Sequence, residues 1–158
     1  MSDPTPSSPP IFDRMFLGEF ARGIDKKGRV TLPATFREAL GEEEAVITRG
    51  IRNYLMLLPK SQFDIFRTKI REMGFASIDA RTFRRHFFSG AALVKPDSMG
   101  RINIPQVLRE HAELTDEVIV AGADYYVEIW NAEHWKEEQR KLAENIDDFA
   151  TRWDSLGF

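Results

Sequence analysis

The sequence contains no cysteine, which excludes disulfide bonds and thiolate metal sites. It has no apolar run near the ~20 residues that a membrane-spanning helix needs, so we expect no membrane partner. The three histidines, His86, His111 and His134, are scattered and do not have the spacing of a metal site. No group of residues suits acid–base or nucleophilic catalysis. We therefore expect no enzyme activity, no cofactor, no metal and no small-molecule substrate.

The first ten residues include four prolines, with Ser and Thr between them. This composition predicts a disordered Pro/Ser-rich tail over residues 1–14, with the ordered pattern beginning at Met15. The segment has neither a basic start nor an apolar centre, so it is not expected to be a secretory signal.

Charge is unevenly distributed along a chain whose net charge is only −3. Residues 14–37 carry six Lys and Arg against two acids, residues 67–86 carry the same numbers, and residues 110–154 carry four against thirteen. This segregation permits a basic face on an acidic protein, as nucleic-acid binding would need. The alternative is that these segments are solvated faces whose charges cancel in three dimensions.

An internal repeat with an offset of 72 residues runs through the chain without gaps. Placing residues 16–40 over 88–112 gives eight identical pairs in 25 positions, where composition alone predicts on the order of one or two. The pairs are Phe16/Phe88, Gly18/Gly90, Asp25/Asp97, Gly28/Gly100, Arg29/Arg101, Pro33/Pro105, Arg37/Arg109 and Glu38/Glu110. Because a single unit this small would bury little surface, the two copies should pack about a pseudo-two-fold axis.

Each repeat is expected to open with a strand and a tight turn. The first copy has a strand over 17–24 and the turn Asp25-Lys-Lys-Gly-Arg29, and the second has the turn Asp97-Ser-Met-Gly-Arg101. Asp at the first position and Gly three residues later suit a type I turn that closes on a left-handed residue. The expected result is a hairpin with a glycine bulge, continued by strands over 30–32 and 102–104.

The remainder of each repeat is expected to contain a short helix, two strands and a longer helix. The short helices should begin at Pro33 and Pro105, because proline is favoured at the first helical position. Strands are predicted over 45–48, 54–58, 118–121 and 126–130. The last helix should run from Ala132 to about Trp153, with an apolar face formed by Trp135, Leu142, Ile146, Phe149 and Trp153.

These elements predict an α+β fold made of two repeats. The expected domains are the tail at 1–14, a first repeat at 15–74, a linker helix at 75–87, and a second repeat with a C-terminal helix at 88–158. The linker helix carries the basic residues Arg81, Arg84 and Arg85. We interpret these as a solvated helix face, or as ion-pair partners of the acidic segment 110–154.

The two turns are the strongest functional candidates. Asp and Arg four residues apart can form an ion pair across the turn, so we interpret Asp25, Gly28, Asp97 and Gly100 as a structural turn motif. The arginines can do more, because a guanidinium group fits phosphate and guanine edges, and a two-stranded ribbon fits the major groove. The candidate DNA contacts are Arg22, Lys26, Lys27, Arg29, Lys95 and Arg101. The first turn should dominate, because the second has Ser and Met in place of the two lysines.

These motifs resemble the MraZ family. The opening Met15-Phe-Leu-Gly, the run Asp25-Lys-Lys-Gly-Arg-Val-Thr-Leu-Pro33 and the run Phe36-Arg-Glu38 are similar to the start of MraZ proteins. Asp97-Ser-Met-Gly-Arg-Ile-Asn-Ile-Pro105 is similar to their second half, and the likeness extends to about Ile146. Family members often have a basic residue at the position of Leu17, so one DNA contact of the family is in doubt here. A single copy of the motif would indicate only the broader SpoVT/AbrB swapped-hairpin group.

The resemblance implies two tandem AbrB-like half-barrels related by pseudo-two-fold symmetry, with flanking helices. It implies a sequence-specific DNA-binding transcriptional regulator of the bacterial division and cell-wall gene cluster, located in the cytoplasm and associated with the nucleoid. Such a regulator forms a ring-like homo-oligomer and binds short direct repeats of double-stranded DNA upstream of its own operon.

Two other readings of the sequence are open. One is an AbrB-like module of the antitoxin type, which would also bind a protein partner. It predicts a disordered partner-binding tail, whereas the C-terminal segment is a well-patterned amphipathic helix. The other is a structural, ring-forming protein without specific operator recognition.

Overall fold

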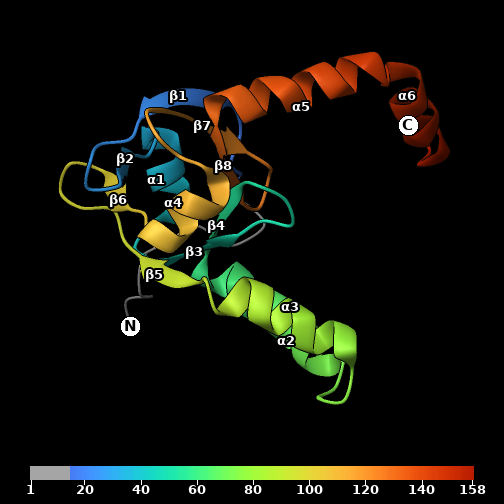
Figure 1. Ribbon diagram of the computed structural model, residues 1–158, viewed down its shortest axis with the longest axis horizontal. Helices are drawn as coiled ribbons and strands as arrows, with labels where there is room; N and C mark the ends of the chain where they lie inside the picture. Colours follow the sequence, from blue (N-terminus) through green and yellow to red (C-terminus); the bar gives the residue numbers. More distant parts are fainter. Residues whose placement is uncertain (1–14) are drawn as a thin grey trace, which may run out of the picture.

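The computed structural model describes residues 15–158, and the predicted tail at 1–14 lies outside the described residues. The first repeat forms β1 (Glu19–Gly23), β2 (Arg29–Thr31), α1 (Ala34–Leu40), β3 (Ala45–Arg49), β4 (Leu55–Pro59) and α2 (Lys60–Glu72), and is followed by α3 (Ile78–Phe88). The second repeat forms β5 (Ala92–Val94), β6 (Arg101–Asn103), α4 (Gln106–Ala112), β7 (Glu117–Gly122), β8 (Val127–Asn131), α5 (Ala132–Glu144) and α6 (Ile146–Ser155). The predicted mixture of helices and antiparallel strands is confirmed (Figure 1).

The strands form a six-stranded sheet in the order β1-β7-β8-β4-β3-β5 and a two-stranded ribbon made of β2 and β6. If each strand of the sheet is replaced by its counterpart in the other repeat, the same order results, read from the opposite edge of the sheet. In the sheet, Met56 of β4 pairs with Glu128 of β8, and in the ribbon Val30 pairs with Ile102. Both pairs join residues 72 positions apart, so the repeats meet at equivalent positions in both places.

The first strand of each repeat pairs with the other repeat. β1 pairs with β7, and β5 pairs with β3. The sequence predicted that the two strands on either side of each turn pair with each other as a hairpin. This prediction is wrong, because the two strands enter different sheets. The physical reason lies in the core: Phe20 of β1 packs edge-on against Phe36, whereas Val30 is fully buried beside Ile102 at the centre of the ribbon.

One hydrophobic core joins the two repeats. It includes Val30, Leu32, Phe36, Leu40, Ile47, Leu57, Ile102, Ile104, Leu108, Val118, Val120 and Ile129. Helices α1 and α4 pack against this core and contribute the buried side chains of Phe36 and Leu108. Pro33 and Pro105 are the N-caps of these helices and not their first residues as predicted. Their backbone is still extended there, with ψ of 143° and 148°, and the helical turn begins one residue later.

The helices outside the core form two arms in Figure 1. The α2–α3 hairpin projects at the bottom, and α5 followed by α6 projects at the top right. The single C-terminal helix of the sequence prediction is wrong, because Asn145, with φ −112° and ψ 28°, separates α5 from α6. Its side-chain amide donates to the carbonyl of Lys141 at 2.9 Å, so the side chain competes for the helical backbone acceptors at this point. Within residues 15–158, none of the helices has the length and apolarity to cross a bilayer.

Candidate nucleic-acid interface

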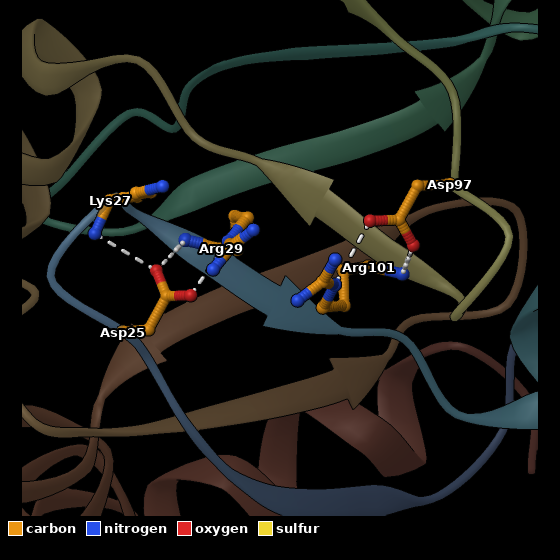
Figure 2. A network of polar contacts seen from close by, with 5 residues as sticks. All are labelled: Asp25, Lys27, Arg29, Asp97 and Arg101. Atoms are coloured by element: carbon orange, nitrogen blue, oxygen red, sulfur yellow. Dashed lines mark hydrogen bonds and ion pairs between the residues drawn. The ribbon is translucent and has the colours of Figure 1, made fainter.

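The turn between β1 and β2 is held by the carboxylate of Asp25 (Figure 2). Its Oδ1 accepts from the backbone N–H of Lys27 at 3.0 Å and of Arg29 at 2.9 Å. Its Oδ2 accepts from Nε of Arg29 at 2.7 Å, which completes an ion pair. Gly28 closes the turn with φ +84°, a left-handed conformation that side chains disfavour. One aspartate thus fixes both the backbone of the turn and the direction of the arginine.

The turn between β5 and β6 repeats this geometry. Oδ1 of Asp97 accepts from the N–H of Met99 and of Arg101, each at 2.9 Å. Its Oδ2 accepts from Nε of Arg101 at 2.9 Å. Gly100 has φ +79°. The structural role that the sequence assigned to the two aspartates and two glycines therefore corresponds to observed contacts in both copies.

The ribbon brings the two arginines onto one surface. Residues alternate between its faces, so Val30 and Ile102 point into the core while Arg29 and Arg101 point the other way. In the register, Arg29 lies opposite Asn103, and Arg101 lies opposite Thr31. Figure 2 shows the two arginines lying between the two aspartates, one from each repeat. The surface is therefore polar, basic at its centre, and alike when the repeats are exchanged.

Each arginine has donors left for a ligand. The side chains of Arg29 and Arg101 are 31% and 27% exposed, and only Nε is committed to the aspartate. Among residues 15–158, the terminal nitrogens Nη1 and Nη2 of these arginines make none of the hydrogen bonds found. A guanidinium held by one edge still presents the pair of donors that bidentate recognition of a base or a phosphate requires.

The other candidate contacts lie around these arginines or behind them. Lys26 and Lys27 are exposed in the first turn, and Lys95 is exposed directly after β5. Lys26 also borders a groove whose other charged residues are Arg109, Glu110 and Glu113, so both signs of charge lie near it. Arg22 is half-buried on β1, where its guanidinium lies 5.5 Å from the centre of the Phe20 ring. It also donates to the carbonyl of Ala21, so its guanidinium is partly engaged within the subunit.

Sequence reasoning missed the roles of Arg37 and Arg109. A Cβ atom on Gly28 would lie 2.7 Å from Nε of Arg109, and one on Gly100 would lie 2.2 Å from Nη1 of Arg37. Each arginine therefore packs against the turn of the opposite repeat. Nε of Arg109 also donates to the carbonyl of Ile104 at 3.0 Å. The available signal was the identity of Arg37 and Arg109 across the repeat, which the turn motif alone does not explain.

The carboxylates of the turns should titrate below their ordinary range. The backbone N–H of Arg29, followed by its guanidinium, lowers the pKa of Asp25 from 3.8, and Arg101 does the same to Asp97. A lowered folded pKa means that the stabilisation from the ionised turn is complete above pH 3.8 and disappears as the pH falls through the folded value. We expect side-chain carboxyl shifts in a ¹³C NMR titration to show both groups ionised at pH 4. Titration of Asp25 at or above 3.8 would contradict the observed geometry.

The second basic cluster makes local contacts. Arg81 donates to the carbonyls of Phe75 and Ala76, and the guanidinium of Arg84 lies 5.8 Å from the centre of the Phe75 ring. These contacts close the α2–α3 loop. They provide none of the predicted pairing with the acidic segment 110–154. In the part of the chain that the structure describes, no group of three His, Asp or Glu side chains is arranged to hold a metal ion.

Comparison with known proteins gives a consistent match along the chain. The family model described as "MraZ protein, putative antitoxin-like" matches residues 15–86 and again residues 87–155. A protein of Heliobacterium modesticaldum named transcriptional regulator MraZ is 41% identical over 138 residues, which are 87% of this chain and 96% of that protein. The proteins of the same name from Alkaliphilus oremlandii and Desulforamulus reducens are 41% and 42% identical. They are matched over 90% and 85% of this chain and 99% of their own length.

Proposed function

Because the chain belongs to the MraZ family, we propose that it is a sequence-specific DNA-binding transcriptional regulator that reads its operator with the β2–β6 ribbon. The observation that carries the proposal is the pair of arginines, Arg29 and Arg101, held by aspartates on one exposed ribbon. The whole-chain match to relatives named transcriptional regulators supports it. The proposal involves no catalytic step.

The finer features belong to the same proposal. The chain is two AbrB-like half-barrels related by a pseudo-two-fold axis, with repeats at 15–74 and 88–158 and a linker at 75–87. The equivalent pairings Val30/Ile102 and Met56/Glu128 support this arrangement. In the cell, the protein acts in the cytoplasm at the nucleoid. There it regulates the division and cell-wall gene cluster from direct repeats upstream of its own operon.

The ribbon suits the major groove by its width and its donors. A two-stranded ribbon can enter the groove, where an arginine binds O6 and N7 of guanine with two donors. Arg29 and Arg101 supply this direct readout. Lys26, Lys27 and Lys95 lie at the margins and contact phosphates, while Arg22 contributes mainly to the positive potential. Phosphate contacts position the ribbon, and base contacts specify the sequence.

A ring-like homo-oligomer accounts for specificity from so small a surface. A single ribbon with two arginines binds one short repeat weakly. Subunits of one ring bind neighbouring repeats together, so each further contact forms at a high effective concentration. The net charge of −3 per chain is then compatible with DNA binding, because only one surface of each subunit faces the duplex.

Fluorescence anisotropy with the DNA upstream of the gene tests the proposal. The protein should bind this duplex more tightly than a scrambled duplex, and binding should weaken as the salt concentration rises. Replacing Lys26 and Lys27 by Gln should lower affinity for both duplexes and reduce the slope of log K against log salt by about 0.9 for each phosphate that is no longer neutralised by a lysine. Replacing Lys136 and Lys141 by Gln removes the same charge from α5 and should leave the slope unchanged.

The same measurement separates the alternatives. Equal weak binding to both duplexes would contradict operator recognition and favour a structural ring. Specific binding that persists unchanged in the Lys26 and Lys27 variant would keep the regulator but remove these lysines from the interface. An antitoxin-type function would require a protein partner that binds the chain tightly and alters its DNA affinity.

A further inference from the structure

The outer face of the β2–β6 ribbon carries four side chains, of which the function proposed above uses only the two arginines. Because residues alternate along each strand, the neighbours of the buried central pair point away from the core. They are Arg29 and Thr31 of β2, and Arg101 and Asn103 of β6. The threonine and the asparagine therefore lie on the same surface as the arginines.

The two ends of the ribbon are related by the repeat, yet they differ in one outward residue. A shift of 72 positions places Arg29 on Arg101 but places Thr31 on Asn103. In the register, Arg29 faces Asn103 at one end, which we call the asparagine end, and Arg101 faces Thr31 at the other, the threonine end. Arginines alone would make the two ends alike, so that the ribbon could bind a site in either direction. The second residue of each end removes this equivalence.

The side chains of Thr31 and Asn103 are available to a ligand. Asn103 is exposed, and Thr31 is half-buried on the outer face. Within residues 15–158, neither side chain takes part in the hydrogen bonds found. The pairing of the strands fixes the backbone at both positions, and facing residues in such a pair have Cβ atoms about 4.5–5.5 Å apart. Each end thus holds an arginine and a second polar group side by side.

The charge of the two turns follows the same division. The turn that leads into the asparagine end carries Lys26 and Lys27. At the equivalent positions, the turn that leads into the threonine end has Ser98 and Met99, and the lysine closest to it in sequence is Lys95. Phosphate contacts should therefore be stronger at the asparagine end. Charge and hydrogen-bonding groups both distinguish one end of the ribbon from the other.

Asparagine and threonine suit different bases in the major groove. The amide of an asparagine can contact N6 and N7 of adenine with two hydrogen bonds, whereas the methyl group of a threonine packs against the methyl group of thymine. The spacing between facing residues is close to the rise of about 3.4 Å between successive base pairs. The asparagine end therefore suits a guanine and an adenine in neighbouring base pairs, and the threonine end suits a guanine and a thymine.

We infer that the ribbon reads an asymmetric DNA site in one direction, with Asn103 and Thr31 specifying the base pairs beside the guanines bound by the two arginines. The inference rests on the DNA-binding function proposed above and deepens it. A reader with two-fold symmetry matches a palindrome. A reader with a fixed direction instead suits the direct repeats of that proposal, since each repeat then presents the same orientation to its subunit.

Selection from a random DNA library tests the inference. The full-length chain is incubated with duplexes that contain about 30 random base pairs, roughly three turns of B-DNA, and the bound duplexes are sequenced. The wild-type chain should enrich an asymmetric site. Asn103→Thr should weaken the preference for adenine beside one guanine by roughly tenfold, as expected for the loss of one bidentate contact. Thr31→Asn should create an adenine preference beside the other guanine and make the site more nearly palindromic.

A double variant and a control sharpen the test. Combining Thr31→Asn with Asn103→Thr should move the adenine preference from one guanine to the other. Thr82→Asn makes the same change at an exposed position of α3, outside the ribbon, and should keep the wild-type preference. Circular dichroism checks that each variant is folded.

The outcomes separate the inference from the proposed function. A palindromic wild-type site, or unchanged base preferences in either folded single variant, would overturn the inference while leaving sequence-specific binding in place. A wild-type chain that enriches no site would overturn the proposed function, and the inference with it.

Discussion

Replacing both Arg29 and Arg101 by Ala should abolish specific operator binding. Each bidentate contact with a base contributes about 1–3 kcal/mol of discrimination, and two such contacts together correspond to a loss on the order of 100-fold or more in affinity for the operator. The two arginines lie on one ribbon and point to the same side, so they act on the same stretch of groove. Titration of the operator duplex, followed by anisotropy at fixed salt, measures the effect.

Two controls separate a loss of base recognition from a loss of charge. Arg52→Ala with Arg67→Ala removes the same charge outside the ribbon and should change operator affinity less than about threefold, a small electrostatic effect at physiological salt. Changing Arg29 and Arg101 to Lys keeps the charge but removes the planar fork. That variant should bind scrambled DNA as well as the wild type does, while losing preference for the operator. Undiminished preference would place base recognition elsewhere on the subunit.

The sequence predicted local structure better than strand partners. The turn at Asp25–Arg29 follows from contacts within five residues, so composition and spacing were enough to predict its geometry. The partner of β1 depends on β7, about a hundred residues later. Alternating apolar residues show which face of a strand is buried but not which strand lies beside it. The exchange of β1 and β5 between the repeats was therefore not predictable from the pattern alone.

The course of the C-terminal helix was partly predictable. The apolar residues at 142, 146, 149 and 153 correctly indicated helix, and they said nothing about a bend at Asn145. Comparison of the repeats contained the missing information, because Gly74 aligns with Ile146. The exposure of these four side chains could not be read from the sequence, since an amphipathic helix has the same pattern whether its apolar face is buried or exposed.

For the candidate site, the sequence identified the charged residues but not how accessible each of them is to DNA. Arg22 and Arg29 look alike in the sequence, yet Arg22 lies over the Phe20 ring and Arg29 is clamped on the outer face of the ribbon. The difference comes from the strand exchange, which sends β1 and β2 into separate sheets. Availability for DNA is therefore a tertiary property, and the spacing of the basic residues does not contain it.

The turn glycines connect this site to the stability of the whole fold. Among Gly→Ala changes in the turns, Gly28→Ala should lower the free energy of unfolding the most. Gly28 has φ +84°, which an alanine tolerates at a cost of about 1–2 kcal/mol. In addition, the new Cβ would lie 2.8 Å from the carbonyl oxygen of Ile104, a backbone atom of the opposite repeat. That strand cannot move away freely, because the N–H of Ile104 donates to the carbonyl of Gly28 at 2.8 Å.

Two other left-handed glycines provide matched controls for this change. Gly74 has φ +81° with nothing within 4 Å of a new Cβ, so Gly74→Ala should show the conformational cost alone. Gly100→Ala faces the guanidinium of Arg37, a flexible group that can shift, so its cost should be intermediate. In denaturant unfolding we expect losses of about 1 kcal/mol for Gly74→Ala and about 3 kcal/mol or more for Gly28→Ala. Equal losses of stability in Gly74→Ala and Gly28→Ala would mean that the two repeats are not in close contact at the Gly28 turn. The ribbon would then lack the rigid support that its arginines need for recognition.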